Sequence, residues 1–154
     1  MSKAMSLTGL EVFDTTVHRT NSWLKELMEV QRWENRQRAY LAFRATLHAL
    51  RDRLTVEEVA HLGAQLPMLV RGFYYEGWDP TGKPLKVRHK DQFLENIRQE
   101  MKVDDPVDPE RIARGVFTVL SKRVSEGEIE NVKHLLPEGI RELWPEFARA
   151  SVER

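Results

Sequence analysis

Residues 55–71 read Thr55-Val-Glu-Glu-Val-Ala-His-Leu-Gly-Ala-Gln-Leu-Pro-Met-Leu-Val-Arg71, and the pattern returns 70 residues later as Ser125-Glu-Gly-Glu-Ile-Glu-Asn-Val-Lys-His-Leu-Leu-Pro-Glu-Gly-Ile-Arg141. Four features recur at this constant offset: a hydroxyl residue, a glutamate three positions further on, a Leu-Pro pair and an arginine. A repeat of this kind predicts a duplicated structural unit. Because there are only two copies, we expect a pair related by a pseudo-twofold axis and not an extended solenoid.

Each copy begins with a capping box. In Thr55-Val-Glu-Glu58 the threonine hydroxyl is expected to accept from the Glu58 amide, while the Glu58 carboxylate reaches back to residue 55. Ser125 and Glu128 repeat this spacing. The Leu-Pro pair that follows places proline in the first turn of another helix, where its missing amide is dispensable. Each copy of the stretch therefore predicts two short helices in succession.

The rest of the chain has a helical apolar period. In the first copy the expected core stripes are Leu10, Phe13, Val17, Leu24 and Leu27, then Tyr40, Phe43, Leu47, Leu50 and Leu54. In the second copy they are Phe93, Leu94, Ile97 and Met101, then Ile112, Val116, Phe117 and Leu120, and finally Ile140, Leu143, Trp144 and Phe147. Aligning Phe13 with Phe93 needs an offset near 80, which predicts about ten extra residues around positions 29–38 of the first copy.

The expected fold is all-α: a tandem repeat of two similar four-helix units, about eight helices in total. Residues 9–76 form the first unit and residues 91–149 the second. Residues 77–90 contain two prolines and two glycines without a helical period, so they are expected to link the units.

Composition excludes several functional classes. The 154 residues are 41% hydrophobic and 31% charged, with 24 basic and 24 acidic side chains, so no overall field attracts nucleic acid or an anionic membrane. There is no cysteine, which removes disulfides and thiolate chemistry. No stretch approaches the roughly 20 apolar residues of a membrane helix, and the first ten residues lack a signal-peptide pattern. We expect a cytoplasmic protein with no membrane partner.

The segment Leu66-Pro-Met-Leu-Val-Arg-Gly-Phe-Tyr-Tyr-Glu-Gly-Trp78 resembles the recurrent pattern of the bacterial proteins grouped as domain of unknown function 2267. The later Val-Ser-Glu-Gly-Glu128 and Leu136-Pro137 fit the same family, and the resemblance spans roughly residues 9–147. It implies an all-helical cytoplasmic protein of unassigned function. It brings no catalytic or binding residues with it.

One pair of residues has the spacing of metal ligands. Glu58 and His61 form Glu-x-x-His, which places both side chains on one helix face in di-iron bundles. Such a site needs the motif twice, whereas Glu128 is followed by Asn131, and Glu58 already has a role as the capping-box carboxylate. No nucleophile elbow, phosphate loop or paired acid-base motif is present. We therefore predict no metal, no cofactor and no catalytic residue.

A basic run lies in the expected linker. It consists of Lys83, Lys86, Arg88, His89 and Lys90, which could contact phosphates. A solvated linker explains the run equally well, and no recognition-helix signature accompanies it. Nucleic-acid binding through this linker ranks third among the functions considered.

Aromatic residues gather where the first copy ends. Phe73 and Tyr74 are expected in the core, whereas Tyr75 and Trp78 are expected to be exposed and, with Arg71, to form an interaction patch. Arg71 shares its repeat position with Arg141, which also favours a structural role such as binding helix-end carbonyls. The favoured function is a non-enzymatic module that binds another protein or a second copy of itself. The alternative is a small-molecule or metal-dependent enzyme with its site in a groove between the repeats.

Overall fold

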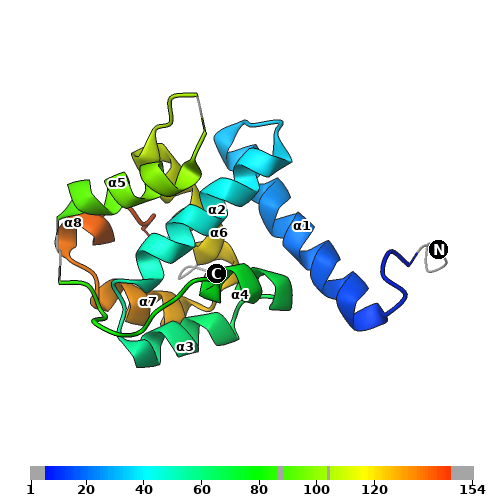
Figure 1. The fold of residues 1–154 in the computed structure, drawn as a ribbon, viewed down its shortest axis with the longest axis horizontal. Coiled ribbons are helices and arrows are strands. Elements are labelled where there is room, and N and C mark those ends of the chain that lie inside the picture. The colour runs from blue at the N-terminus through cyan, green and yellow to red at the C-terminus, as the bar shows by residue number, and fades with distance from the viewer. Residues whose placement is uncertain (1–5, 87–88, 104, 147–154) are drawn as a thin grey trace, which may run out of the picture.

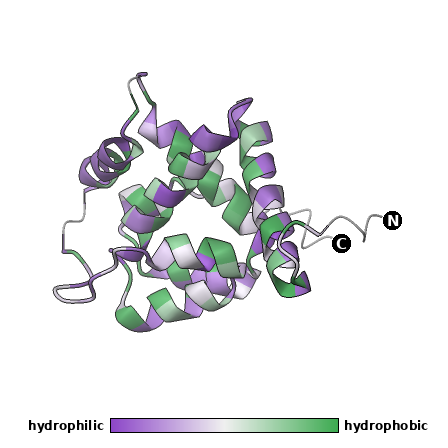
Figure 2. Cartoon of the chain, turned by 45° about the vertical axis from the view of Figure 1, so that its right-hand side comes forward, coloured by the Kyte–Doolittle hydropathy of each residue, from purple (hydrophilic) through white to green (hydrophobic). Residues whose placement is uncertain are grey.

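The computed structural model describes residues 6–86, 89–103 and 105–146, and these form eight helices and no strand (Figure 1). The predicted all-α class and the number of helices are confirmed. The helices are α1 (Glu11–Gln31), α2 (Arg36–Arg51), α3 (Val56–Ala64), α4 (Met68–Tyr75), α5 (Lys90–Met101), α6 (Pro109–Arg123), α7 (Glu126–His134) and α8 (Glu138–Arg141). Figure 2 shows hydrophobic and hydrophilic residues within the same helices, as expected of amphipathic helices that turn one face to the core.

The predicted N-caps start α3 and α7. The Thr55 hydroxyl accepts a hydrogen bond from the Glu58 amide at 3.1 Å, and the Ser125 hydroxyl accepts from the Glu128 amide at 3.2 Å. Each bond satisfies an amide that the helix itself leaves without a partner. The helices that the capping residues predict therefore begin where the sequence places them.

The centre of the molecule is formed by α2 and α6, which pack against each other. Both α1 and α5 lie against both of these central helices, while α3 packs on α7. Phe43 and Leu47 from α2 and Phe117 from α6 are fully buried in one continuous core. The two predicted units therefore do not close separately, because each contributes helices to the same hydrophobic interior.

Contacts between the two halves are reciprocal. The Arg53 guanidinium lies 5.2 Å from the ring centre of Phe93, and the Arg123 guanidinium lies 5.8 Å from the ring centre of Trp23. Arg123 is the repeat equivalent of Arg53, and Phe93 is the repeat equivalent of Trp23, each at the offset of 70. In one pair the arginine comes from the first half of the chain, and in the other it comes from the second half. Each arginine also donates to a second residue of the same helix, at the same offset: Asn96 and Glu26. Two units related by a twofold axis make each contact twice, once in each direction, so these paired contacts support the predicted pseudo-twofold axis.

The predicted insertion lies in a different place. Trp23 and Phe93 are equivalent at the ordinary offset of 70, and both are buried. The additional residues therefore lengthen the N-terminal end of α1, which has 21 residues against 12 in α5. This end extends beyond the rest of the molecule, so Leu10 and Phe13 are 50% and 47% exposed and do not enter the predicted core stripe (Figure 1).

The second half ends in a shorter helix than the first. Helix α8 has four residues where α4 has eight, although Leu143 and Trp144, which follow α8, are buried as predicted. Phe147 lies outside the described residues. The segment between the halves is tied to α2 by a hydrogen bond from the Leu85 amide to the Asp52 carbonyl at 2.8 Å.

Candidate functional site

A groove of about 790 Å³ lies between α1, α2 and α4. Its walls carry apolar and aromatic side chains: Val17, Leu24, Tyr40, Leu69, Phe73 and Tyr75. Tyr40 and Phe73 meet edge to face with ring centres 5.3 Å apart, which fixes the wall where α2 faces α4. Helix α1 is joined to α4 beside the groove, because the Thr16 hydroxyl accepts a hydrogen bond from the Leu69 amide at 2.9 Å.

Two charged residues line the groove. Glu76 is neutralised by Arg44, whose guanidinium lies 2.8 Å from the Glu76 carboxylate and holds the pKa of Glu76 below its usual value. Arg36 is exposed and forms no ion pair with any residue that the structure describes. The groove is therefore apolar, with one uncompensated positive charge at its edge.

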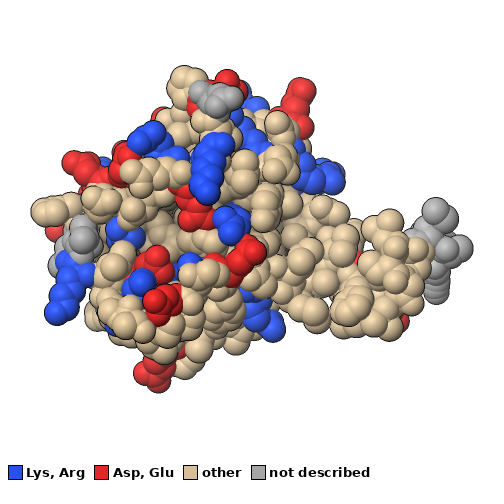
Figure 3. Space-filling model, viewed as in Figure 1, with Lys and Arg blue, Asp and Glu red and all other residues tan. Residues whose placement is uncertain are grey.

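A second hollow of about 390 Å³ lies next to the groove along α1. Val12 and Met68 line it and are 49% and 47% exposed, while Leu69 in the groove itself is 46% exposed. The projecting end of α1 shows few charged residues on the face drawn in Figure 3, in contrast to the mixed charges over the rest of that face. Exposed apolar side chains thus extend the groove toward the N-terminal end of α1.

The residues of the predicted interaction patch lie close together on α4 and just after it. Tyr75 lines the groove, and Trp78 packs on it with ring centres 5.8 Å apart. Both side chains are partly buried against the core, so the prediction that they are exposed is wrong. The physical reason is that α3 approaches closely at Gly63, where no side chain keeps the Tyr75 ring away.

Arg71 has the structural role that its repeat position predicts. Its guanidinium donates to two carbonyls at the end of α3, and Arg141 donates to the two equivalent carbonyls at the end of α7. The acceptors are Gly63 and Leu66 for Arg71, both at 2.8 Å, and Lys133 and Leu136 for Arg141, at 3.1 and 2.8 Å. These bonds satisfy carbonyls that the helix ends leave free. Arg71 therefore fixes α4 against α3.

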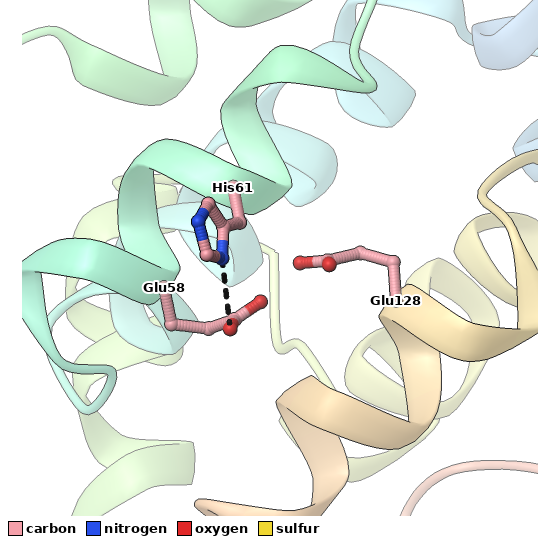
Figure 4. Close-up of side chains that lie close together, drawn as sticks. All are labelled: Glu58, His61 and Glu128. Atoms are coloured by element: carbon pink, nitrogen blue, oxygen red, sulfur yellow. Dashed lines mark ion pairs between the residues drawn. The ribbon is translucent and has the colours of Figure 1, made fainter.

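The groove lies within the first half of the chain and not between the halves. A smaller hollow of about 500 Å³ does lie between α1 and α6, lined mainly by polar residues such as Gln31 and Arg111. The boundary between the halves also brings together Glu58 and His61 from α3 with Glu128 from α7 (Figure 4). The sequence relates the two glutamates as repeat equivalents but gives no signal that they meet.

Glu58 and Glu128 are both 7% exposed. In each, the Oε2 atom is buried without a hydrogen-bond partner among the described residues. The Oε1 atom of Glu58 lies 3.6 Å from Nδ1 of His61, and one oxygen or nitrogen from each of the three side chains lies within 4.8 Å of the others. Carboxylate oxygen and imidazole nitrogen are both metal-ligand atoms.

The capping boxes are therefore only half formed. Glu58 makes no hydrogen bond to the Thr55 amide, because its carboxylate turns inward toward α7. The expectation that the Glu58 carboxylate is occupied by capping is wrong. It is available for other chemistry.

Burial and, after it, the neighbouring Glu58, which acts through a hydrogen bond and its charge, together raise the pKa of Glu128 to about 7. The positive charge of His61 opposes this shift in part. Neither glutamate forms an ion pair with a described lysine or arginine. The two buried carboxylates therefore lie close together, and among the described residues the basic side chain beside them is His61, 3.6 Å from Glu58.

The described members of the basic run do not form one exposed basic cluster. Lys90 belongs to α5 and lies 3.7 Å from Glu110 and 3.5 Å from Glu142, so its charge is compensated. Arg88 lies outside the described residues. Lys83 is partly buried, which leaves Lys86 and His89 as the exposed described members of the run.

None of the described helices has the length and apolar character needed to cross a bilayer. No curated protein matches the chain. A family model described as an uncharacterized conserved protein, DUF2267, matches residues 20–143. The match runs from the middle of α1 to the residues just after α8, and it leaves out the projecting first turns of α1. The chain belongs to the DUF2267 family.

Proposed function

We propose that this protein is a non-enzymatic interaction module that holds an amphipathic helix of another protein in the groove between α1, α2 and α4. The observation that carries the proposal is the apolar lining of the groove together with the exposed Leu69, Met68 and Val12 that extend it. Exposed apolar surface that continues into a hollow is typical of protein-binding sites.

The shape of this surface favours a helix as the occupant. Residues 12–24 of α1 line the two hollows, and at 1.5 Å per residue this wall is about 18 Å long, or three turns of a bound helix. A helix presents anchors at i, i+3, i+4 and i+7 to a groove of this kind. Tyr75, supported by Trp78 behind it, supplies a rigid aromatic contact on the wall.

The charge of the groove specifies the partner further. Arg36 lines the groove without a described counterion, whereas Glu76 is already paired with Arg44. A partner helix with a carboxylate at the end that meets Arg36 complements this pattern. The occupant is therefore an amphipathic helix with an acidic residue beside its apolar face.

The test compares two variants in a pull-down from native lysate. Leu69→Asp places a charge in the groove, and Val56→Asp places one at an equally exposed apolar position on α3. The proposal expects a partner that binds the wild type and Val56→Asp but not Leu69→Asp. A peptide from that partner should become helical on binding, and Arg36→Glu should weaken it, with recovery when the peptide's acidic residue is replaced by lysine.

Three results would overturn the proposal. The first is a partner that Leu69→Asp retains. The second is a wild-type dimer in sedimentation that Leu69→Asp dissociates, which would assign the groove to a second copy. The third is a small molecule that co-purifies with the protein and occupies the groove, whose volume is in the range of ligand pockets.

A further inference from the structure

The buried glutamates on α3 and α7 are not used by the groove. Removing two carboxylates from water is costly unless a cation or a proton compensates them. No described lysine or arginine pairs with either residue, and each glutamate keeps one oxygen buried without a partner. The arrangement is one that a bound cation completes.

We propose that Glu58, His61 and Glu128 bind one divalent transition-metal ion at the contact between α3 and α7. The inference is independent of the groove and of its partner.

The three side chains converge from two helices on a common point (Figure 4). Their ligand atoms lie within 4.8 Å of one another, and Glu58 Oε1 is 3.6 Å from His61 Nδ1. Ligands at about 2.1 Å from a tetrahedral ion are about 3.4 Å apart. The spacing of Glu58 and His61 is already close to this value, and a change of rotamer at Glu128 would bring its carboxylate in as the third ligand.

The donor set selects the class of ion. One imidazole with two carboxylates suits Zn²⁺, Mn²⁺ and Fe²⁺, whereas Mg²⁺ and Ca²⁺ prefer oxygen ligands alone. Three protein ligands leave a coordination position for water. The His61 side chain is 56% exposed, so an ion reaches the buried carboxylates from that side.

The pseudo-twofold arrangement explains why there is only one imidazole. Glu58 and Glu128 are repeat equivalents, and the equivalent of His61 is Asn131. Asn131 lies close enough to Glu128 to lower the pKa of that carboxyl through its amide. Asn131→His would therefore add a second imidazole on the opposite side of the same pair of carboxylates.

Zinc binding to the full-length protein tests the proposal. Protein dialysed against a chelator is titrated with Zn²⁺ by calorimetry at pH 7.5, and Co²⁺ absorption in the visible range reports the ligand geometry. We expect one equivalent in the wild type, at least tenfold weaker binding in His61→Asn and in Glu128→Gln, and tighter binding in Asn131→His. His134→Asn is the matched control, since His134 is an exposed histidine near the end of α7, and its zinc affinity should be unchanged.

Absence of zinc binding by the wild type would overturn the proposal and leave the two carboxylates sharing a proton. Binding that survives both His61→Asn and Glu128→Gln would overturn it as well, since the ion would then be held elsewhere. His61 is exposed, so we expect the His61→Asn variant to fold, and its circular dichroism separates a loss of affinity from unfolding.

Discussion

Glu58 and Glu128, which are 70 residues apart in the sequence, face each other across the contact between α3 and α7, and each keeps one carboxylate oxygen buried without a partner. Both are the third helical residue after an N-cap, and both turn away from that cap toward the other half of the molecule. The repeat therefore brings two equivalent carboxylates together in one buried position.

The stability of the metal-free protein should fall as pH rises from about 4.5 to 7. Burial and Glu58 raise the pKa of folded Glu128 to about 7, so the folded state binds a proton that the unfolded state releases at lower pH. The contribution of the Glu128 proton to stability is complete below pH 4.5 and is lost as pH passes 7. The free energy of unfolding should fall by on the order of 2 kcal/mol over this range. Urea unfolding in chelator at pH 5 and pH 8 measures it. Glu128→Gln should flatten the profile, and identical profiles for the two proteins would contradict the assignment.

Arg71 and Arg141, which bind carbonyls at the ends of α3 and α7, should contribute equally to the stability of the protein. Arg71→Ala and Arg141→Ala each remove two hydrogen bonds to carbonyls, which should cost about 1–2 kcal/mol per variant. Lysine should not restore the loss, because it lacks the forked geometry of the guanidinium. Denaturant midpoints report the effect, with the exposed Arg98→Ala as control. An effect at one position only would argue against the equivalent roles.

The two N-caps should differ in strength. Thr55→Ala should cost about 1 kcal/mol. Ser125→Ala should cost more, since the Ser125 hydroxyl also accepts from the Gln65 side chain at 3.1 Å. Thermal unfolding measures both losses. No loss at either position would remove the capping assignment.

Two helical glycines should respond to alanine in opposite directions. A methyl group at Gly115 would overlap the Gln31 side-chain amide, which donates to the Arg111 carbonyl, so Gly115→Ala should destabilise the protein by about 1–3 kcal/mol. Gly127 on α7 has open space around it, so Gly127→Ala should stabilise by about 0.5–1 kcal/mol. A stabilised Gly115→Ala variant would show that α1 and α6 are not in close contact there.

The sequence predicted those features of the fold that depend only on residues close together in the chain. The N-caps and the carbonyl-binding Arg71 follow from short-range backbone needs, and the structure has them. Helices α4 and α8 begin directly after the two Leu-Pro pairs, with proline as the N-cap residue and not in the first turn. The placement of Leu10 and Phe13 in the core was wrong because an apolar stripe does not reveal whether a partner helix is long enough to cover it. Phe13 extends beyond the core for that reason.

The candidate sites depend on tertiary packing, which the sequence alone did not provide. Tyr75 was predicted to be exposed because nothing in the sequence shows that α3 approaches its ring at Gly63. The Glu58 carboxylate was assigned to its own cap because its distance from Glu128 depends on how α3 and α7 pack. Both differences arise where residues far apart in the chain meet.

The most direct test of the account is a double-mutant cycle on Glu58 and Glu128, measured by urea unfolding at pH 8 in chelator. If the two carboxylates repel each other in one buried place, Glu58→Gln and Glu128→Gln each stabilise the protein, and the double variant is no more stable than either one. Stability changes that simply add would contradict the account, because they would show that the two side chains do not meet.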